Sequence, residues 1–342
     1  MKILHRLIGP FEKPLVIAEI GINHDGDINV AKSMVKAARD SGCECVKHQT
    51  HFLEDEMTSE AKNIFPPNDH RSIWEIMECC SLSKDEEIQL KKYTEELGMI
   101  YLSTPFSRSA ADFLNDIGIA GFKIGSGECD NIPLVRHIAN FGKPIIMSTG
   151  MQTINSIRGS VKILEDANVE YALLECTNLY PSPAEIVSLN GIFELRDAFP
   201  NAQIGFSDHS IGPTMALAAT ALGAVILERH FTISRYSNGP DIICSMDPSE
   251  LRFLIDRSEE IHTALQNKKE RSLLENATYQ FARSSIVADR DLEAGSIICE
   301  SDIWARRPGS GDIAGFDFDK LIGRVLNKDL KKNDQLTWSD ID

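Results

Sequence analysis

Short runs of hydrophobic residues alternate with amphipathic stretches from residue 15 to about residue 266. The amphipathic stretches have helical spacing, as in NVAKSMVKAARDSG before the second run and TINSIRGSVKILEDA after the fifth. Nearly continuous hydrophobic runs are typical of parallel strands, because helices cover both faces of such a sheet. The predicted strands are residues 15–20, 44–49, 99–104, 121–126, 143–149, 171–176, 202–207 and 224–229.

Eight strand–helix units within about 250 residues predict an α/β fold, the (β/α)8 or TIM barrel. A doubly wound open sheet is the alternative, but the first turn from strand to helix lacks a G-x-G-x-x-G fingerprint. In a barrel, functional side chains stand at the C-terminal ends of the strands. The long polar insertion at residues 50–84 is expected to lie over that face.

The pattern changes after residue 266. Residues 267–280, NKKERSLLENATYQ, are polar and charged, as in a linker. Short predicted strands with many turn residues follow, which indicates a separate small β-rich domain. We therefore predict a barrel over residues 1–266, a linker over 267–280 and a β-rich domain over 281–342.

The charge of the chain narrows the range of partners. Its 51 acidic and 35 basic residues give a formal net charge of −16. Such a field repels nucleic acid and anionic membranes, so we expect neither as a partner. It also repels an anionic substrate, so a site for one needs cations of its own.

The N-terminal segment MKILHRLIGPFEK lacks the apolar core of a signal peptide, and no later run approaches the roughly 20 apolar residues that span a bilayer. The eight cysteines include adjacent and one-apart pairs, which fit neither a zinc ribbon nor a disulfide framework. We interpret them as reduced thiols, most of them filling the core, and predict a cytoplasmic protein.

Nearly every predicted strand ends in polar residues. Strand ends that meet water explain some of these, but not the lysines flanked by apolar residues, Lys47 in CVKHQ and Lys123 in GFKIG. A buried lysine is costly unless an anion or a carboxylate meets it. Two inward lysines beside hydroxyl groups favour an anionic ligand such as a phosphate, with structural ion pairs as the alternative.

His209 and His230 are 21 residues apart, about one strand–helix repeat. This spacing places them at the ends of neighbouring strands, where both imidazoles can bind one metal ion. Two imidazoles leave coordination positions open for a substrate oxygen. Such a site suits a divalent ion that acts as a Lewis acid on a carbonyl group.

A series of motifs follows the strand ends: AEIGINHDG (18–26), VKHQTH (46–51), STPFS (103–107), KIGSGE (123–128), STGM (148–151), CTNLYPSP (176–183), GFSDHS (205–210), ERHFT (228–232) and GPD (239–241). In these segments the sequence resembles the sialic acid synthase family, and within it the bacterial N-acetylneuraminate synthases. The tail, with RRPGSG at 306–311, resembles the antifreeze-like (SAF) domain of that family, which implies a shared small β-clip fold and not ice binding.

The resemblance implies a TIM barrel followed by a SAF domain, in a domain-swapped homodimer whose tails each cap the partner's site. It implies that His209 and His230 bind a divalent ion, manganese or else magnesium or cobalt, and that Glu19 acts as a general base or positions water. The residues implied for phosphoenolpyruvate are Lys47, Thr104, Lys123, Ser126, Ser148, Asn178 and Ser207. Those implied for the N-acylated sugar are Gln49, Asn68, Glu128, Tyr180, Asp241 and, from the other protomer, Arg307.

The function that the resemblance implies is condensation of phosphoenolpyruvate with open-chain N-acetylmannosamine and water, with release of phosphate. Relatives that make legionaminic or pseudaminic acid from 6-deoxy-diamino sugars share the same skeleton and are the first alternative. A second is a Schiff-base aldolase with Lys47 or Lys123 as nucleophile, which leaves the histidine pair without a role. A third, a non-catalytic sugar-binding or antifreeze-type module, leaves both the lysines and the histidines unexplained.

Overall fold

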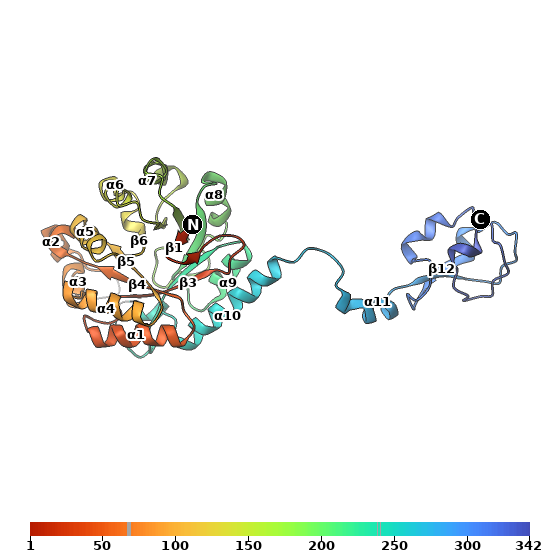
Figure 1. The fold of residues 1–342 in the computed structure, drawn as a ribbon, viewed down its shortest axis with the longest axis horizontal. Coiled ribbons are helices and arrows are strands. Elements are labelled where there is room, and N and C mark those ends of the chain that lie inside the picture. The colour runs from red at the N-terminus through yellow and green to blue at the C-terminus, as the bar shows by residue number, and fades with distance from the viewer. Residues whose placement is uncertain (67–69, 238, 240) are drawn as a thin grey trace. The chain divides into compact units, whose positions relative to one another are not determined.

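A computed structural model describes residues 1–66, 70–237, 239 and 241–342. The chain forms two compact units, Met1–Asn267 and Lys268–Asp342 (Figure 1). Among the described residues, no helix has the length and apolar character that a membrane span needs.

Eight parallel strands close into a barrel in the first unit, which confirms the predicted fold class. The strands follow one another around the barrel in chain order, and β10 pairs with β3 to close it. In that pairing His230 lies opposite Glu19, so two candidate site residues stand at the same level. The strands are β3 (Leu15–Gly21), β4 (Cys45–Thr50), β5 (Ile100–Pro105), β6 (Phe122–Ile124), β7 (Ile145–Ser148), β8 (Tyr171–Cys176), β9 (Gln203–Asp208) and β10 (Ile226–His230).

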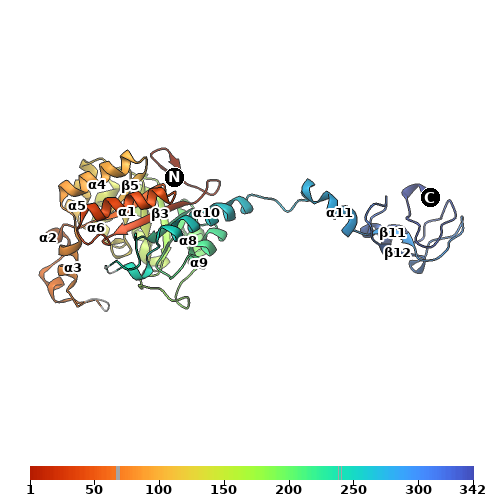
Figure 2. The same cartoon turned by 90° about the horizontal axis from the view of Figure 1, so that it is seen from below.

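Helices surround the strands as a ring (Figures 1 and 2). Several begin with capping boxes, for example Ser83 with Glu86 and Asp247 with Glu250, which satisfy N–H groups that a helix start leaves unpaired. The helices that follow the strands are α1 (Ile28–Asp40), α4 (Lys84–Glu96), α5 (Arg108–Asp116), α6 (Ile132–Ala139), α7 (Ile154–Asp166), α8 (Gly191–Ala198), α9 (Thr214–Ala221) and α10 (Pro248–Leu265).

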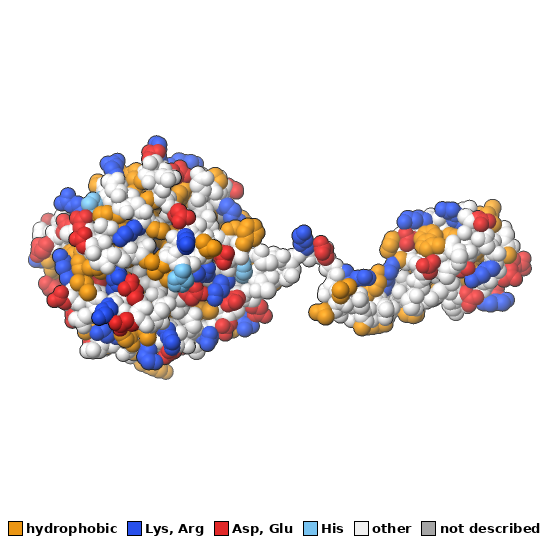
Figure 3. All heavy atoms as spheres, in the orientation of Figure 1, with side chains coloured by type: hydrophobic (Ala, Val, Ile, Leu, Met, Phe, Trp, Pro, Cys, Tyr) orange, Lys and Arg blue, Asp and Glu red, His pale blue; other side chains and the backbone are white. Residues whose placement is uncertain are grey.

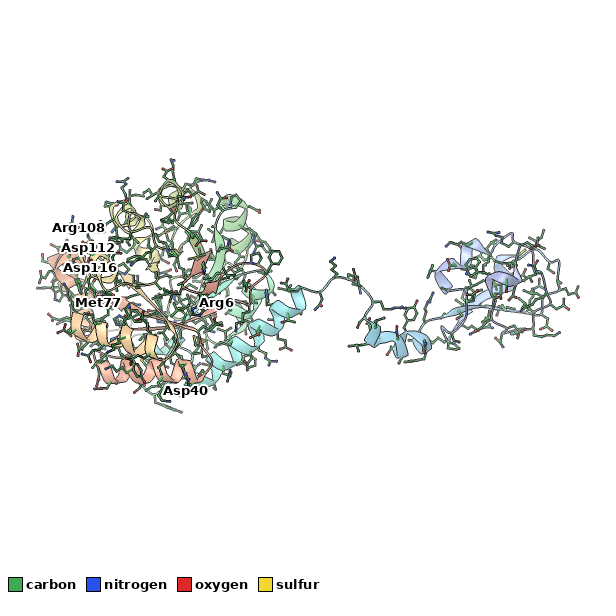
Figure 4. The ribbon with its side chains drawn as sticks, viewed as in Figure 1. Arg6, Asp40, Met77, Arg108, Asp112 and Asp116 are labelled. Atoms are coloured by element: carbon green, nitrogen blue, oxygen red, sulfur yellow. The ribbon has the colours of Figure 1, made fainter. Side chains whose placement is uncertain are left out.

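The barrel helices are amphipathic, and α5 illustrates how this orients them. Arg108, Asp112 and Asp116, four residues apart, lie along one side of α5 (Figure 4), while Ala111 and Leu114 are fully buried. Acidic and basic side chains are interspersed over the visible face of the first unit (Figure 3), so the negative charge of the chain does not gather there in one patch.

A short N-terminal hairpin, β1 (Lys2–Ile3) and β2 (Arg6–Leu7), closes the N-terminal end of the barrel. Ile3 and Ile8 belong to the same hydrophobic cluster as interior residues of β3, β4, β5 and β7. Arg6, which Figure 4 labels within the ring of helices, donates a 2.8 Å hydrogen bond to Glu44 Oε2 at the start of β4. Hydrophobic side chains of the hairpin therefore fill this end of the barrel.

The insertion after β4 contains α2 (Leu53–Glu56), the 3-10 helix η1 (Ser59–Asn63) and α3 (Ile73–Cys80). Ile76 and Cys80 of α3 form a buried cluster with Ile22, which lies in the loop after β3. The insertion therefore packs on a loop at the C-terminal face of the barrel.

The second unit has its own hydrophobic core, which includes Ile286, Leu292, Ile298 and Leu336. Its regular strands are β11 (Ser285–Ala288) and β12 (Ile303–Arg306), which pair antiparallel. Part of the segment that we predicted as a linker is helical: η4 (Leu273–Glu275) and α11 (Asn276–Ala282) follow a capping box that Ser272 begins. A local capping motif thus starts a helix within a polar stretch.

Candidate active site

A cavity of about 140 Å³ lies at the C-terminal ends of the barrel strands. It draws lining residues from β4, β5, β6, β7, β8, β9 and β10 and from the loops after them. The residues that line it are Lys47, Gln49, Thr104, Phe106, Lys123, Gly125, Ser126, Gly127, Ser148, Cys176, Asn178, Tyr180, Ser207, His209, Glu228 and His230.

The alternation of side chains along β4 explains how such a site arises. Lys47 and Gln49 face the cavity, whereas His48 lies 3.4 Å from Glu87 of α4 and Thr50 donates a 2.6 Å hydrogen bond to the same carboxylate. Successive side chains of a strand point to opposite faces, so the sequence K-H-Q-T sends two side chains inward and two toward the helices.

All seven residues implied for phosphoenolpyruvate line this cavity. Four of them form hydrogen-bonded pairs across neighbouring strands: Lys47 donates to Thr104 Oγ1 at 3.2 Å and Lys123 to Ser148 Oγ at 2.7 Å. Ser126 Oγ accepts from the backbone N–H of Gly150 at 3.0 Å. A Cβ atom at Gly150 would lie 1.8 Å from Asn178 Oδ1, so only glycine leaves room for that side chain.

Both lysines are buried and both have carboxylate partners. Lys47 Nζ lies 2.6 Å from Glu19 Oε2 and 3.7 Å from Glu228 Oε1, and Lys123 Nζ lies 3.4 Å from Glu228 Oε1. Burial lowers the pKa of Lys47, but the charges of Glu19 and Glu228 outweigh it and the net shift is upward. For Lys123, burial dominates and the pKa is lowered.

Structural ion pairs, the alternative considered for the lysines, are therefore present. They account for the charges but not for the hydroxyl and amide groups that converge on the same cavity. The positive charges of the two lysines are balanced by the negative charges of the two carboxylates. Binding of an anion therefore requires a further positive charge in the site. A divalent cation bound nearby would supply that charge.

Glu228 is a charged residue of the cavity to which the sequence analysis assigned no role. It contacts both lysines and also Ser207 Oγ, which donates to its Oε1 at 3.4 Å. Burial raises the pKa of Glu228, Lys123 and Lys47 lower it, and the net shift is downward. The signal was the one that identified the lysines, a charged residue inside an apolar run, here AVILER.

His209 and His230 lie side by side, with ring centroids 5.5 Å apart. His209 Nδ1 is 2.8 Å from the carbonyl oxygen of Thr177, which can only accept, so the proton lies on Nδ1 and Nε2 keeps its lone pair. His230 Nδ1 is buried and hydrogen-bonds to no residue that the structure describes, with Asp241 Oδ2 3.5 Å away. Burial lowers the pKa of each histidine to about 4.

Neutral imidazoles with available lone pairs are what a divalent metal ion requires. A protonated pair would repel the ion, and an apolar pair would not hold it. Asp241, whose pKa burial raises to about 6, adds a carboxylate beside His230. The donor set of His209, His230 and Asp241 therefore fits a borderline or hard divalent ion.

Among the residues implied for the sugar, Gln49 and Tyr180 line the cavity. Gln49 is held from both sides: its Nε2 donates to Glu19 Oε1 at 2.9 Å, and His51 Nε2 lies 3.2 Å from its Oε1. Glu128 lines an adjacent cavity of about 260 Å³, and Phe106 lines both cavities.

The other residues implied for the sugar are Asp241, which lies beside His230, and Asn68 and Arg307. Asn68 lies outside the described residues. Arg307 belongs to the second unit, where its side chain is exposed. Cys176 at the end of β8 and Phe106 in the loop after β5 line the cavity without having been predicted, since neither a thiol nor an apolar ring stands out beside a hydrophobic run.

Comparison with known proteins gives consistent matches along the chain. The model of the NeuB family matches residues 34–270, and that of the SAF domain matches residues 283–342. An N,N'-diacetyllegionaminic acid synthase of Campylobacter jejuni is 33% identical, over 94% of this chain and 98% of its own length. An N-acetylneuraminate-9-phosphate synthase of Drosophila melanogaster is 32% identical, over 95% of both chains.

A solved structure has the same architecture. The N-acetylneuraminic acid synthetase of Leptospira borgpetersenii, in complex with citrate, superimposes with a TM-score of 0.73 at 29% identity, covering 81% of this chain and 94% of its own.

Proposed function

The chain belongs to the NeuB family, and from that premise we propose that it condenses phosphoenolpyruvate with the open-chain form of N-acetylmannosamine and water, releasing phosphate and N-acetylneuraminate. The observation that carries the proposal is the pair of buried lysines beside serine, threonine and asparagine side chains at the barrel mouth.

We assign the phosphate and carboxylate groups of phosphoenolpyruvate to the part of the cavity that Lys47 and Lys123 line. Lys47 and Lys123 supply positive charge, while Thr104, Ser126 and Ser148 supply hydroxyl groups at fixed positions. Preorganised donors in a site that excludes water stabilise negative charge more strongly than water does. When the anion binds, it takes over lysine contacts that Glu19 and Glu228 now make.

The reaction joins carbon 3 of phosphoenolpyruvate to the aldehyde carbon of the sugar. Electron flow from the enol leaves carbon 2 positively charged, water adds there, and the tetrahedral intermediate loses phosphate to give a keto acid. Glu19 is 2% exposed and contacts Lys47, which we assign to the anion, and Gln49, which we assign to the sugar. We propose that it accepts the proton of the attacking water.

His209 and His230 would hold the divalent ion, for which we propose manganese, with magnesium or cobalt as substitutes. When bound, the ion supplies Lewis acidity toward the aldehyde oxygen. Tyr180 stacks on His209 with ring centroids 4.1 Å apart, so it orients that imidazole while its other face is available to the sugar.

A second candidate is synthesis of a legionaminic or pseudaminic acid from a 6-deoxy-diamino sugar. It is favoured by the 33% identity to a legionaminic acid synthase, which equals or exceeds that to neuraminate-type relatives. The eight cysteines are all unpaired, which fits a reducing compartment, and we propose that the reaction takes place in the cytoplasm.

The choice of sugar can be measured by phosphate release. With phosphoenolpyruvate and Mn2+, we expect phosphate release with N-acetylmannosamine at least about tenfold faster than with its 6-phosphate or with a 2,4-diacetamido-6-deoxy sugar. Chelation by EDTA should abolish the release, and Mn2+ should restore it. A preference for the diacetamido sugar would establish the second candidate.

Absence of phosphate release with every sugar would overturn the synthase proposal. Borohydride trapping of pyruvate on Lys47 or Lys123, with no effect of EDTA, would support the Schiff-base aldolase instead.

We further propose that the protein is a domain-swapped homodimer in which Arg307 of one protomer reaches the N-acyl end of the sugar in the other. Large apolar side chains are exposed in the second unit, including Leu273, Leu274, Phe281 and Phe316, and Figure 3 shows hydrophobic atoms gathered on the segment that begins it. Exposed apolar groups of this extent are typical of a surface that another chain covers.

Complementation tests this arrangement. Arg307→Ala and Glu19→Gln should each be nearly inactive as homodimers. After refolding together they should regain activity, because one barrel of the mixed dimer combines an intact Glu19 with an intact Arg307 from the other chain. Arg324→Ala, another exposed arginine of the second unit, should remain active alone. Failure of mixing to restore any activity would contradict the swap.

A further inference from the structure

One carboxylate and two thiols, side chains of the kinds that bind metal ions, lie close together on the C-terminal side of the barrel. They are not part of the pair formed by His209 and His230. Asp25 lies in the loop after β3, and Cys79 and Cys80 end α3. Cys79 Sγ is 3.8 Å and Cys80 Sγ is 3.6 Å from Asp25 Oδ1. Within the described part of the chain, this is the only group of three such side chains whose ligand atoms all lie within 4.8 Å of one another.

The fold brings these residues together from segments 54 residues apart. The loop after β3 approaches the end of α3 so closely that a Cβ atom at Gly26 would lie 2.4 Å from the carbonyl oxygen of Cys79. Glycine is needed there both for this contact and for its φ of +74°. The Ile22, Ile76 and Cys80 cluster packs the same two segments together beneath the surface.

The spacing of the ligand atoms suits a tetrahedral ion. Bonds of about 2.3 Å from zinc to sulfur and about 2.0–2.2 Å to oxygen imply sulfur-to-oxygen separations of about 3.6 Å. The observed separations of 3.6 and 3.8 Å differ little from that value. Two sulfur ligands select zinc over manganese or magnesium, which prefer oxygen.

We propose that Asp25, Cys79 and Cys80 form a binding site for a zinc-class divalent ion, with water completing the coordination. The adjacent His24 is not a ligand, because its Nε2 lies 3.1 Å from His48 Nε2 and its Nδ1 accepts a hydrogen bond from Gly26 at 3.2 Å. Asp25 and Cys79 are exposed and Cys80 is buried, so the ion can enter from solvent.

Such an ion would clamp the loop after β3 to the insertion that follows β4. The clamp is distinct from the proposed His209 and His230 site, because it offers thiolates and that site offers imidazoles. Burial and the charge of Asp25 raise the pKa of the Cys80 thiol to about 12, and a bound cation would favour the thiolate.

Cobalt substitution of the full-length protein tests the proposal. About one Co2+ per chain should give a thiolate-to-cobalt charge-transfer band in the near ultraviolet, with the intense visible bands of tetrahedral cobalt. The band should persist in a His209→Ala, His230→Ala background, since imidazoles give no such transition. It should be lost in Cys79→Ser and in Asp25→Asn, whose exposed positions tolerate the change, and kept in Cys299→Ser, which alters the other exposed cysteine.

A second measurement needs no variant. Zinc should slow alkylation of Cys79 by iodoacetamide at least about tenfold, while Cys299 in the same chain reacts unchanged, as read by peptide mass spectrometry. Absence of the charge-transfer band from the His209→Ala, His230→Ala protein at stoichiometric cobalt would overturn the proposal. So would its survival in both Cys79→Ser and Asp25→Asn.

Discussion

Replacement of Glu19 by glutamine is expected to lower kcat at least about 100-fold, the scale of a lost general base, while phosphoenolpyruvate still binds. The amide is almost isosteric and can keep the contact with Gln49, whose Nε2 donates to Glu19 Oε1 at 2.9 Å. It cannot accept the proton of the attacking water. Loss of this carboxylate also removes a competitor for Lys47, 2.6 Å away, so anion binding should not weaken.

Single-turnover phosphate release and calorimetric titration with phosphoenolpyruvate separate these two effects. Glu44→Gln is the matched control, because Glu44 lies at the closed end of the barrel, where it pairs with Arg6. Near-normal turnover of the Glu19 variant would remove Glu19 from the chemistry. If binding and turnover fell together, Glu19 would act only by holding Lys47.

Replacement of Lys123 by methionine is expected to weaken binding of phosphoenolpyruvate by about 2–5 kcal/mol, the cost of losing one member of a buried charge contact. That is a rise in Kd of at least about 30-fold. Lys123 is 2% exposed and donates to Ser148 at 2.7 Å, so water cannot replace its charge. Glu228, 3.4 Å away, would then also repel the ligand.

Titration calorimetry without sugar measures this change. Lys143→Met removes a lysine just before β7, at the end of that strand opposite to Ser148, and should leave the Kd unchanged. Equal thermal stability of the two variants would show that the barrel is intact. An unchanged Kd in Lys123→Met would mean that the anion site lies elsewhere.

The barrel could be predicted because its evidence is local. Eight hydrophobic runs separated by amphipathic stretches repeat along the chain. Parallel strands that are covered by helices on both faces occur in only a few fold classes, of which the eight-stranded barrel is one. Lys47 and Lys123 could be identified for a similar reason. Each lies within an apolar run, and burial of a charged side chain costs free energy unless a partner of opposite charge is present. The hairpin of β1 and β2 was not predicted, because strands of two residues carry no periodicity.

Other features depend on which segments come together. The ion pairs of Glu228 with Lys47 and Lys123 join β10 to β4 and β6, and no spacing in the sequence links these three residues. The free Nε2 of His209 follows from a hydrogen bond to Thr177, which lies after a different strand. The spacing of the cysteines predicts that most of them fill the core, whereas Cys79 is exposed and lies 3.8 Å from Asp25 Oδ1.

By itself, the sequence determined the fold class, the end of the barrel at which the cavity lies and most of the polar side chains that line it, since periodicity and strand position are properties of single segments. Only the tertiary structure decided how these side chains are paired. It shows that the lysines meet carboxylates and that both histidines are buried, which favours their neutral form. It also brings a carboxylate and two thiols together. Pairing depends on distances of a few ångströms between segments far apart in the chain, and closure of the barrel sets those distances.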